Sequence, residues 1–329
     1  MELPLTLREA VAAALNGVPL AALRVASARL SQRYRWEVRD GTLHLSDDLD
    51  ALAYIGVRMP GTYAAIRQCF AWVAERVPAF APATMLDAGA GPGTAVFAAS
   101  DCWPGLRDAD LVESSAAVRA RGEALMSCAG PQRAVWRDTD LLKGDLAPEP
   151  RDLVTLAYVL DEVAPDARGL LIERLWAAAA QMLVLVEPGT PSGWTRILAA
   201  RKRLIAAGAQ IVAPCPHALP CPLVAPDWCH FARRLARSRM HRQIKAADVP
   251  FEDEKFIYLA AARYPLPAQP AAARILAPPM VRGGHASLKL CRPDGSAGPR
   301  ALSRRDGAAF RAVKRLGWGD VIMPSDSSD

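Results

Sequence analysis

The sequence predicts an α/β fold built on a doubly wound parallel sheet. Three observations lead to this prediction: short apolar runs recur along the chain, stretches of helical periodicity separate them, and a glycine-rich turn follows the first run. Strands and helices that alternate in this way form a parallel sheet with right-handed crossovers. The predicted strands cover residues 84–87, 109–113, 134–137, 153–157 and 182–186.

A helical region is predicted before the sheet, over residues 1–80. Its first part, residues 5–30, is rich in Ala and Leu and is broken into two helices at Gly17 and Pro19. A second helical pattern covers residues 48–77 and contains a break at Pro60-Gly61.

The sheet domain is predicted to occupy residues 81–329. It contains a cysteine-rich and basic insertion at 211–250 and ends in a basic tail at 296–329, whose last residues, S-D-S-S-D, are expected to be disordered. Further strands are expected to continue the same sheet, at residues 255–260, 274–276 and 285–291.

Composition limits the class of protein. Hydrophobic residues make up 51% of the 329 residues, which is ample for a large core, and no run of about 18 apolar residues predicts a membrane span. Glu2 and Glu9 lie where a signal or transit peptide would be basic or free of acids, so we expect a cytoplasmic protein. We also expect a monomer. A net charge of +6 with a pI near 9.1 favours an acidic partner such as nucleic acid.

The glycine turn lies at the carboxyl end of the first predicted strand, where ligands bind in doubly wound sheets. A dinucleotide fingerprint, G-x-G-x-x-G, needs a third small residue where Thr94 stands, which weakens the prediction of NAD binding. The turn instead resembles motif I of the class I S-adenosylmethionine-dependent methyltransferases, D-x-G-x-G-x-G, formed here by Asp87, Gly89, Gly91 and Gly93.

This resemblance implies roles for two acidic residues. Glu113, about 20 residues past the turn at the end of the second strand, would accept hydrogen bonds from the ribose hydroxyls of S-adenosylmethionine. Asp138, just after the third strand, is the candidate for the adenine amino group, with Asp140 as a rival.

The fourth strand gives no catalytic signature. Residues 157–163 read A-Y-V-L-D-E-V, without the D/N-P-P-Y/F sequence of amino-group methyltransferases. Asp161 and Glu162 are candidates for a general base, but capping of the next helix is the interpretation that we favour. The catalytic residues are therefore left unassigned.

Three cysteines, Cys215, Cys221 and Cys229, fall within fifteen residues of one another. Five prolines in residues 214–230 exclude a continuous helix or a central strand, so thiolate coordination of a metal or cluster is the favoured explanation. Gaps of five and seven residues are wider than those of most zinc sites, although zinc with His217 or His230 as a ligand stays an alternative.

Residues 230–245 contain six Arg or Lys and no acid. They are predicted to form a helix with His230, Arg234, Arg237 and His241 on one face. Arginine forks suit phosphate, so this segment is predicted to contact RNA, with a solvated helix face as the alternative. The predicted RNA contacts are Arg233, Arg234, Arg237 and Arg242.

The whole chain resembles the methyltransferase-like proteins associated with the mitochondrial ribosomal small subunit and their bacterial relatives. The resemblance covers about Tyr54 to Asp320 and rests on L-D-A-G-A-G-P-G-T, A-P-C-P-H-A-L-P-C-P-L, D-W-C-H-F, F-E-D-E-K-F-I-Y-L and R-L-G-W-G-D. It implies a methyltransferase fold, binding to small-subunit rRNA during assembly, and possible rRNA methylation. It also implies a [4Fe–4S] cluster on Cys215, Cys221, Cys229 and Cys291. The alternatives are a noncatalytic assembly factor with a structural zinc site and, less favoured, a small-molecule methyltransferase.

Overall fold

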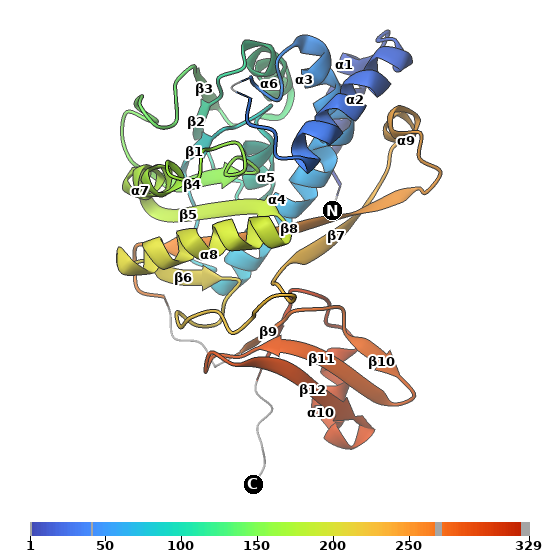
Figure 1. The fold of residues 1–329 in the computed structure, drawn as a ribbon, viewed down its shortest axis with the longest axis vertical. Coiled ribbons are helices and arrows are strands. Elements are labelled where there is room, and N and C mark those ends of the chain that lie inside the picture. The colour runs from blue at the N-terminus through green and yellow to red at the C-terminus, as the bar shows by residue number, and fades with distance from the viewer. Residues whose placement is uncertain (1, 41, 267–271, 324–329) are drawn as a thin grey trace.

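A computed structural model describes residues 2–40, 42–266 and 272–323 of the chain. The predicted disordered end, S-D-S-S-D, lies outside these residues. The fold consists of a large mixed sheet with helices on both faces and a second, smaller sheet beneath it (Figure 1).

Four helices form the N-terminal region, as the sequence predicts: α1 (Leu5–Leu15), α2 (Leu20–Arg35), α3 (Asp48–Val57) and α4 (Met59–Arg76). The break between α3 and α4 falls at Arg58, and Pro60 lies in the first turn of α4, where its missing N–H leaves no bond unmade. Across the described part of the chain, no single helix is long and apolar enough to cross a membrane; the bent pair α1 and α2 passes by length and composition only.

The large sheet has the strand order β3-β2-β1-β4-β5-β8-β6, and β7 pairs with β8 outside this path. Strands β1 to β5 are parallel, which confirms the predicted doubly wound arrangement, whereas β8 runs antiparallel to β5, β6 and β7. The strands are β1 (Thr84–Ala88), β2 (Asp108–Val112), β3 (Arg133–Arg137), β4 (Arg151–Ala157), β5 (Ala179–Pro188), β6 (Gln210–Ala213), β7 (Phe231–Ala236) and β8 (Phe251–Ala262).

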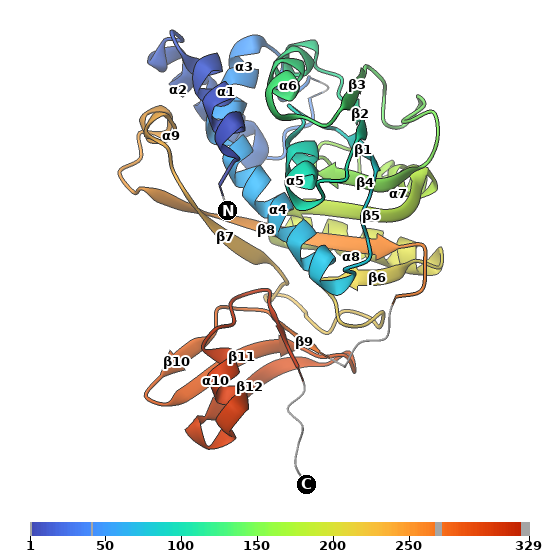
Figure 2. The same ribbon diagram turned by 180° about the vertical axis from the view of Figure 1, so that it is seen from behind.

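Helices cover both faces of this sheet. Figures 1 and 2 show α7 and α8 on one face and α4 and α5 on the other. The central strands are buried on both sides because of this double cover, so they read as continuous apolar runs. The covering helices are α5 (Thr94–Cys102), α6 (Ala116–Ala129), α7 (Arg168–Ala178) and α8 (Pro191–Ala206).

The predicted helix over residues 230–245 is wrong. The first part is strand β7, and only Arg239–Lys245 is helical, as α9. The reason is long-range pairing: the register sets Arg233 and Arg234 opposite Glu254 and Asp253 of β8, and cross-strand pairs of opposite charge stabilise a hairpin. This hairpin extends past the sheet and carries α9 to the side of α2 (Figure 2), where Arg24 donates a hydrogen bond to the carbonyl of Gln243 at 2.9 Å.

The expected continuation of the main sheet through residues 274–291 is also wrong. These residues belong to a second, five-stranded sheet with its own core, which includes Leu288, Leu290 and Phe310. Residues 296–323 are folded into this unit, although the sequence predicts a tail. Its elements are β9 (Ala273–Ile275), β10 (Met280–Arg282), β11 (His285–Cys291), β12 (Ala297–Ser303), η1 (Arg304–Asp306), α10 (Gly307–Val313) and β13 (Val321–Ile322).

Trp72 and Arg274 join the two sheets. Trp72 of α4 stacks on Tyr258 at 5.6 Å between ring centroids, and the positive-φ Gly319 of the second unit lies against it so closely that a Cβ would overlap the indole. The buried guanidinium of Arg274 donates to the carbonyl of Pro214 at 2.9 Å and to that of Gly319 at 2.6 Å. One side chain therefore ties the second sheet to the start of the cysteine-rich loop.

Candidate functional site

A cavity of about 600 Å³ opens at the carboxyl ends of β1, β2 and β4. Of the six residues predicted to bind the cofactor, four line it: Gly89, Gly91, Glu113 and Asp138. The rival Asp140 lines it as well. The glycine turn and the acids after β2 and β3 therefore lie on the wall of one cavity.

The three glycines of the turn, Gly89, Gly91 and Gly93, all have positive φ, but their surroundings differ. A Cβ at Gly89 would lie 2.6 Å from Val159, and one at Gly93 would overlap Met126, so both positions need close backbone packing. At Gly91 a Cβ would meet no described atom within 4 Å. Gly91 is therefore the position where backbone faces open space that a ligand can fill.

Glu113 is bound to this turn. One carboxylate oxygen accepts a hydrogen bond from the N–H of Gly91 at 3.0 Å, and the other from the N–H of Ser115 at 2.8 Å. Burial raises the pKa of Glu113, although these backbone donors act against the rise. Asp138 is more exposed and pairs with Arg119 at 2.9 Å.

Asp87 lies beneath the turn. One of its oxygens accepts from the hydroxyl of Thr155 at 2.6 Å, whereas the other, also buried, has no hydrogen-bond partner in the described structure. Burial raises the pKa of Asp87 to about 7. A buried acceptor without a donor is costly, so this oxygen is suited to a ligand or water that can donate to it.

The end of β4 contributes two more acids to the cavity, Asp161 and Glu162. The favoured prediction that they cap the next helix is wrong: α7 begins after Ala167, several residues further on, and Ala167 makes no side-chain cap. One oxygen of Asp161 is buried without a partner among the described atoms. Desolvation, and then the neighbouring Asp161, raise the pKa of Glu162 to about 8, although its side chain keeps 34% of its surface exposed.

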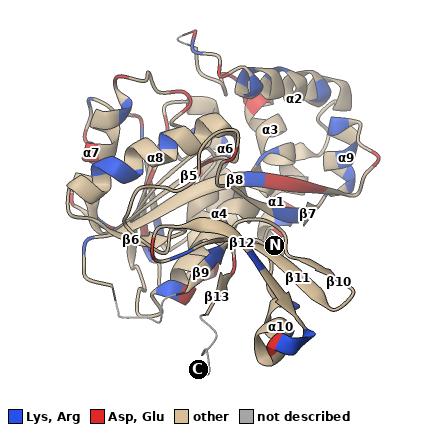
Figure 3. Ribbon diagram, turned by 60° about the horizontal axis from the view of Figure 1, so that its bottom comes forward, with Lys and Arg blue, Asp and Glu red and all other residues tan. Residues whose placement is uncertain are grey.

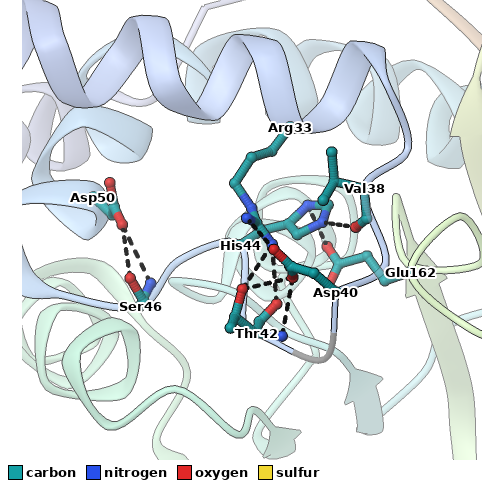
Figure 4. A network of polar contacts seen from close by, with 8 residues as sticks. All are labelled: Arg33, Val38, Asp40, Thr42, His44, Ser46, Asp50 and Glu162. Atoms are coloured by element: carbon teal, nitrogen blue, oxygen red, sulfur yellow. Dashed lines mark hydrogen bonds and ion pairs between the residues drawn. The ribbon is translucent and has the colours of Figure 1, made fainter.

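His44 reaches Glu162 from the N-terminal region, and no motif in the sequence predicted this contact. Figure 4 shows its ring between Val38 and Glu162, with Nε2 at 2.8 Å from the carbonyl oxygen of Val38 and Nδ1 at 3.5 Å from a Glu162 oxygen. The loop that carries His44 is held by Arg33, which donates two hydrogen bonds to Asp40 at 3.0 and 2.8 Å.

A second cavity of about 880 Å³ adjoins the first and shares Tyr34, Arg58 and Asp161 with it. Its lining includes Trp36, which is 75% exposed, and Lys245 of α9. Within the described residues, Arg58 makes no hydrogen bond or ion pair, and its guanidinium lies 5.7 Å from the ring centroid of Tyr34. Arg58 therefore lies on the wall that the two cavities share.

All four predicted metal ligands, Cys215, Cys221, Cys229 and Cys291, line one small cavity between the proline-rich loop and β11. His217 lines it too, with its Nε2 at 3.4 Å from the sulfur of Cys291, whereas His230 does not. Burial, and then the neighbouring thiols of Cys215 and Cys221, raise the pKa of Cys291 to about 12.

The spacing of these thiols bears on which metal group they could bind. Among residues 2–40, 42–266 and 272–323, no three His, Cys, Asp or Glu side chains are close enough to bind a single ion. A tetrahedral zinc site requires that closeness. Four thiols line this one small cavity, and four is also the number of cysteine ligands that a [4Fe–4S] cluster takes.

The predicted RNA contacts differ from one another in the structure. Arg234 pairs with Asp253 at 2.8 Å and Arg237 with Glu252 at 3.1 Å, so acids of β8 neutralise both. Arg233 is half-buried. Arg242 on α9 is exposed and has no ion pair in the described part of the chain.

The strand order, the glycine turn and the acid after β2 define a protein with a class I methyltransferase fold. The chain belongs to the family described as mitochondrial small ribosomal subunit Rsm22, whose family model matches residues 48–323.

Two kinds of curated relative match the chain. It is 30% identical over 331 residues to the ribosome assembly protein METTL17, mitochondrial, of Homo sapiens, covering 94% of this chain and 68% of that protein. It is 22% identical over 335 residues to the Rsm22-cox11 tandem proteins 1 and 2, mitochondrial, of Schizosaccharomyces pombe, covering 86% of this chain. The chain spans 44% of the length of each yeast protein.

Solved structures match less closely. Magnesium protoporphyrin IX methyltransferase from Synechocystis with bound SAH has 16% identity and a TM-score of 0.40, over 71% of this chain and 94% of that one. A putative RNA methyltransferase from Pyrococcus horikoshii has 11% identity and a TM-score of 0.40, over 60% and 80% of the two chains.

Proposed function

We propose that this protein acts in assembly of the small ribosomal subunit, binds its rRNA and S-adenosylmethionine, and holds a [4Fe–4S] cluster. The observation that carries the proposal is membership of the Rsm22 family, together with the similarity to a human ribosome assembly protein. The compartment we propose is the bacterial cytoplasm. Co-sedimentation of the purified protein with small subunits tests the assembly role, and sedimentation of the protein only as a free species would contradict it.

S-adenosylmethionine is proposed to occupy the 600 Å³ cavity. Glu113 would accept hydrogen bonds from the ribose, Asp138 from the adenine amino group, and the methionine end would lie along Gly89 and Gly91. The support is the open space at Gly91 and the position of both acids on the cavity wall.

Titration calorimetry with S-adenosylmethionine tests this site. Gly91→Arg should abolish the heat, because the new side chain enters the cavity. Gly17→Arg is the matched control: Gly17 also has positive φ and open space around it, but it lies between α1 and α2. Absence of heat with the wild-type protein would overturn the proposal.

The cluster is proposed to lie in the cavity lined by Cys215, Cys221, Cys229 and Cys291. Bound there, it would supply covalent links between the proline-rich loop and the second sheet. Anaerobic purification with iron and zinc quantification, alongside an absorption spectrum, tests the assignment. A colourless protein that contains zinc would show that the cluster assignment is wrong and that the zinc alternative holds.

Methyl transfer to an rRNA base is a further part of the proposal. The acceptor would enter by the second cavity, and Asp161 or Glu162 would take its proton, because both lie where the two cavities approach each other. The competing function is a noncatalytic assembly factor, which the missing D/N-P-P-Y/F sequence favours. Incubation of immature small subunits with methyl-labelled S-adenosylmethionine separates the two: label in rRNA supports the enzyme, and label-free rRNA supports the assembly factor.

A further inference from the structure

The positive charge of this protein is concentrated in the second sheet. Residues 273–323 contain ten Lys or Arg against three Asp, a net charge of +7, whereas the whole chain carries +6. The rest of the chain is therefore close to neutral despite its many arginines. An acidic partner, which the high pI favours, would therefore be attracted mainly to this unit of about 50 residues.

Most of these charges are free to bind a partner. Six of them are exposed and make no ion pair with any described residue: Arg282, Arg304, Arg305, Arg311, Lys314 and Arg315. By contrast, the predicted contacts Arg234 and Arg237 are already bound to acids of β8. Binding of phosphate by those two would break an existing pair, whereas the free cations need only release counterions.

The free cations form one surface. The register aligns Arg282 with His285 and His285 with Ser303, and the N–H of Arg304 donates to the carbonyl of Gly284 at 3.0 Å. The β10–β11 turn therefore lies beside η1. Arg311 lies on α10, and Lys314 and Arg315 directly follow that helix in a turn, where the N–H of Arg315 donates to the carbonyl of Ala312 at 3.0 Å. Figure 3 shows blue segments at α10, at the end of the molecule that the second sheet forms.

We propose that this surface, defined by Arg282, Arg304, Arg305, Arg311, Lys314 and Arg315 and here called the basic face, binds the phosphate backbone of small-subunit rRNA. Five of its six cations are arginines, whose planar fork matches phosphate oxygens. The inference rests on the rRNA binding proposed above and assigns that binding to a different part of the chain. The hairpin arginines Arg234 and Arg237 then serve to hold β7 against β8.

The test measures binding of the full chain to a fluorescein-labelled transcript of small-subunit rRNA by anisotropy, at several salt concentrations. The triple variant Arg305→Glu/Arg311→Glu/Arg315→Glu removes half of the basic face. The matched control, Arg107→Glu/Arg133→Glu/Lys202→Glu, makes the same change in net charge at three exposed cations of the large sheet and its helices, none of which has an ion pair among the described residues. Thermal unfolding shows that both variants are folded.

The triple variant is expected to bind at least 100-fold more weakly. The slope of log affinity against log salt concentration should decrease in magnitude by about 2 to 3, since each lost phosphate contact lowers that slope by about 0.7 to 0.9. The control should stay within about threefold of wild type. The conservative variant Arg305→Lys/Arg311→Lys/Arg315→Lys should retain most of the affinity.

Equal losses in the triple variant and the control would overturn the inference, because net charge alone would then explain binding. If the wild-type protein and the triple variant bind the transcript equally well, the assignment of rRNA binding to the basic face is wrong, but the proposed rRNA binding itself stands. If the wild-type protein does not bind the transcript, the proposed rRNA binding falls with it. Co-sedimentation with anionic phosphatidylglycerol vesicles, lost in the triple variant while RNA binding is unchanged, would assign the face to a membrane and overturn the inference.

Discussion

The carboxylate of Glu113 accepts a hydrogen bond from the backbone N–H of Gly91 across 3.0 Å and so ties the end of β2 to the turn after β1. The acid and the glycine lie on the wall of the same cavity. A bound ribose would take its place among the hydrogen bonds of a carboxylate that is already oriented, which lowers the entropic cost of binding.

Glu113→Gln should weaken S-adenosylmethionine binding by about 10- to 100-fold, because a neutral amide accepts from hydroxyls less strongly than a carboxylate. The amide oxygen can accept from only one of the two N–H groups that Glu113 now binds, those of Gly91 and Ser115, so the variant should also lose about 1 kcal/mol of unfolding free energy. Calorimetry measures the affinity, and Asp138→Asn is the control at the more exposed acid, where a smaller loss is expected. Unchanged affinity in Glu113→Gln would remove the ribose role.

Asp87→Asn should stabilise the protein above neutral pH. The folded-state pKa of Asp87 is about 7, above its ordinary value of 3.8, so the stability that its proton provides is complete below pH 4 and is lost as pH rises to 7. At pH 8 the variant should gain about 1–3 kcal/mol in the free energy of unfolding, and at pH 4 nothing. Urea unfolding at both values checks this.

Asp152→Asn should change the free energy of unfolding at pH 8 in the opposite direction from Asp87→Asn. Asp152 accepts from the N–H groups of Ala83 and Thr84, both at 3.0 Å, and although burial acts against it, these and its side-chain donors lower its pKa. The ionised carboxylate of Asp152 stabilises the folded protein above the pKa of the unfolded chain, and this stabilisation is lost as pH falls. Asp152→Asn should therefore destabilise the protein at pH 8. A gain in both variants at pH 8 would contradict the assignment for Asp87.

Glu252→Gln should destabilise the hairpin. Burial disfavours its charge, but His241, Lys245 and Arg237 outweigh burial and hold the pKa of Glu252 at about 2. The variant should lose about 1–3 kcal/mol of unfolding free energy at pH 7, because it leaves buried donors without a charged partner, and the difference should disappear as pH falls toward 2. Urea unfolding of Asp253→Asn, whose pair with Arg234 is exposed, should show a much smaller loss.

Cys291→Ser should remove most of the bound iron and its visible absorption, because the second sheet supplies this thiol alone to the cavity. Cys69→Ser is the control, since Cys69 is buried in α4 and does not line that cavity. Iron quantification per chain measures both. Full iron content in Cys291→Ser would show that the cluster does not need the second sheet.

The sequence predicted what depends on local pattern. The central strands β1, β4 and β5 are largely apolar because helices cover both faces, and the glycine turn needs positive φ, so both features can be recognised in the sequence. Glu113 was found by its distance from that turn along the sequence.

Long-range partners account for what the sequence did not predict. Residues 230–245 satisfy a helical pattern when they are considered alone, and only pairing with Asp253 and Glu254 selects a strand. His44 meets Glu162 across more than 100 residues, and no local pattern reports such a contact. The charge of the second sheet was visible in the sequence, but not that η1 and α10 fold it into one surface.

The position of Cys291 has a consequence for the order of events in the cell. Between Cys229 and Cys291 the chain forms β7, α9, β8, β9 and β10. During synthesis, the loop at residues 214–230 therefore leaves the ribosome with three thiols and waits for the fourth until β11 has emerged and folded. In the proposed centre, the cluster can be completed only in a chain whose second sheet has already folded. The iron supply would therefore determine how many copies hold the basic face in a fixed position for rRNA.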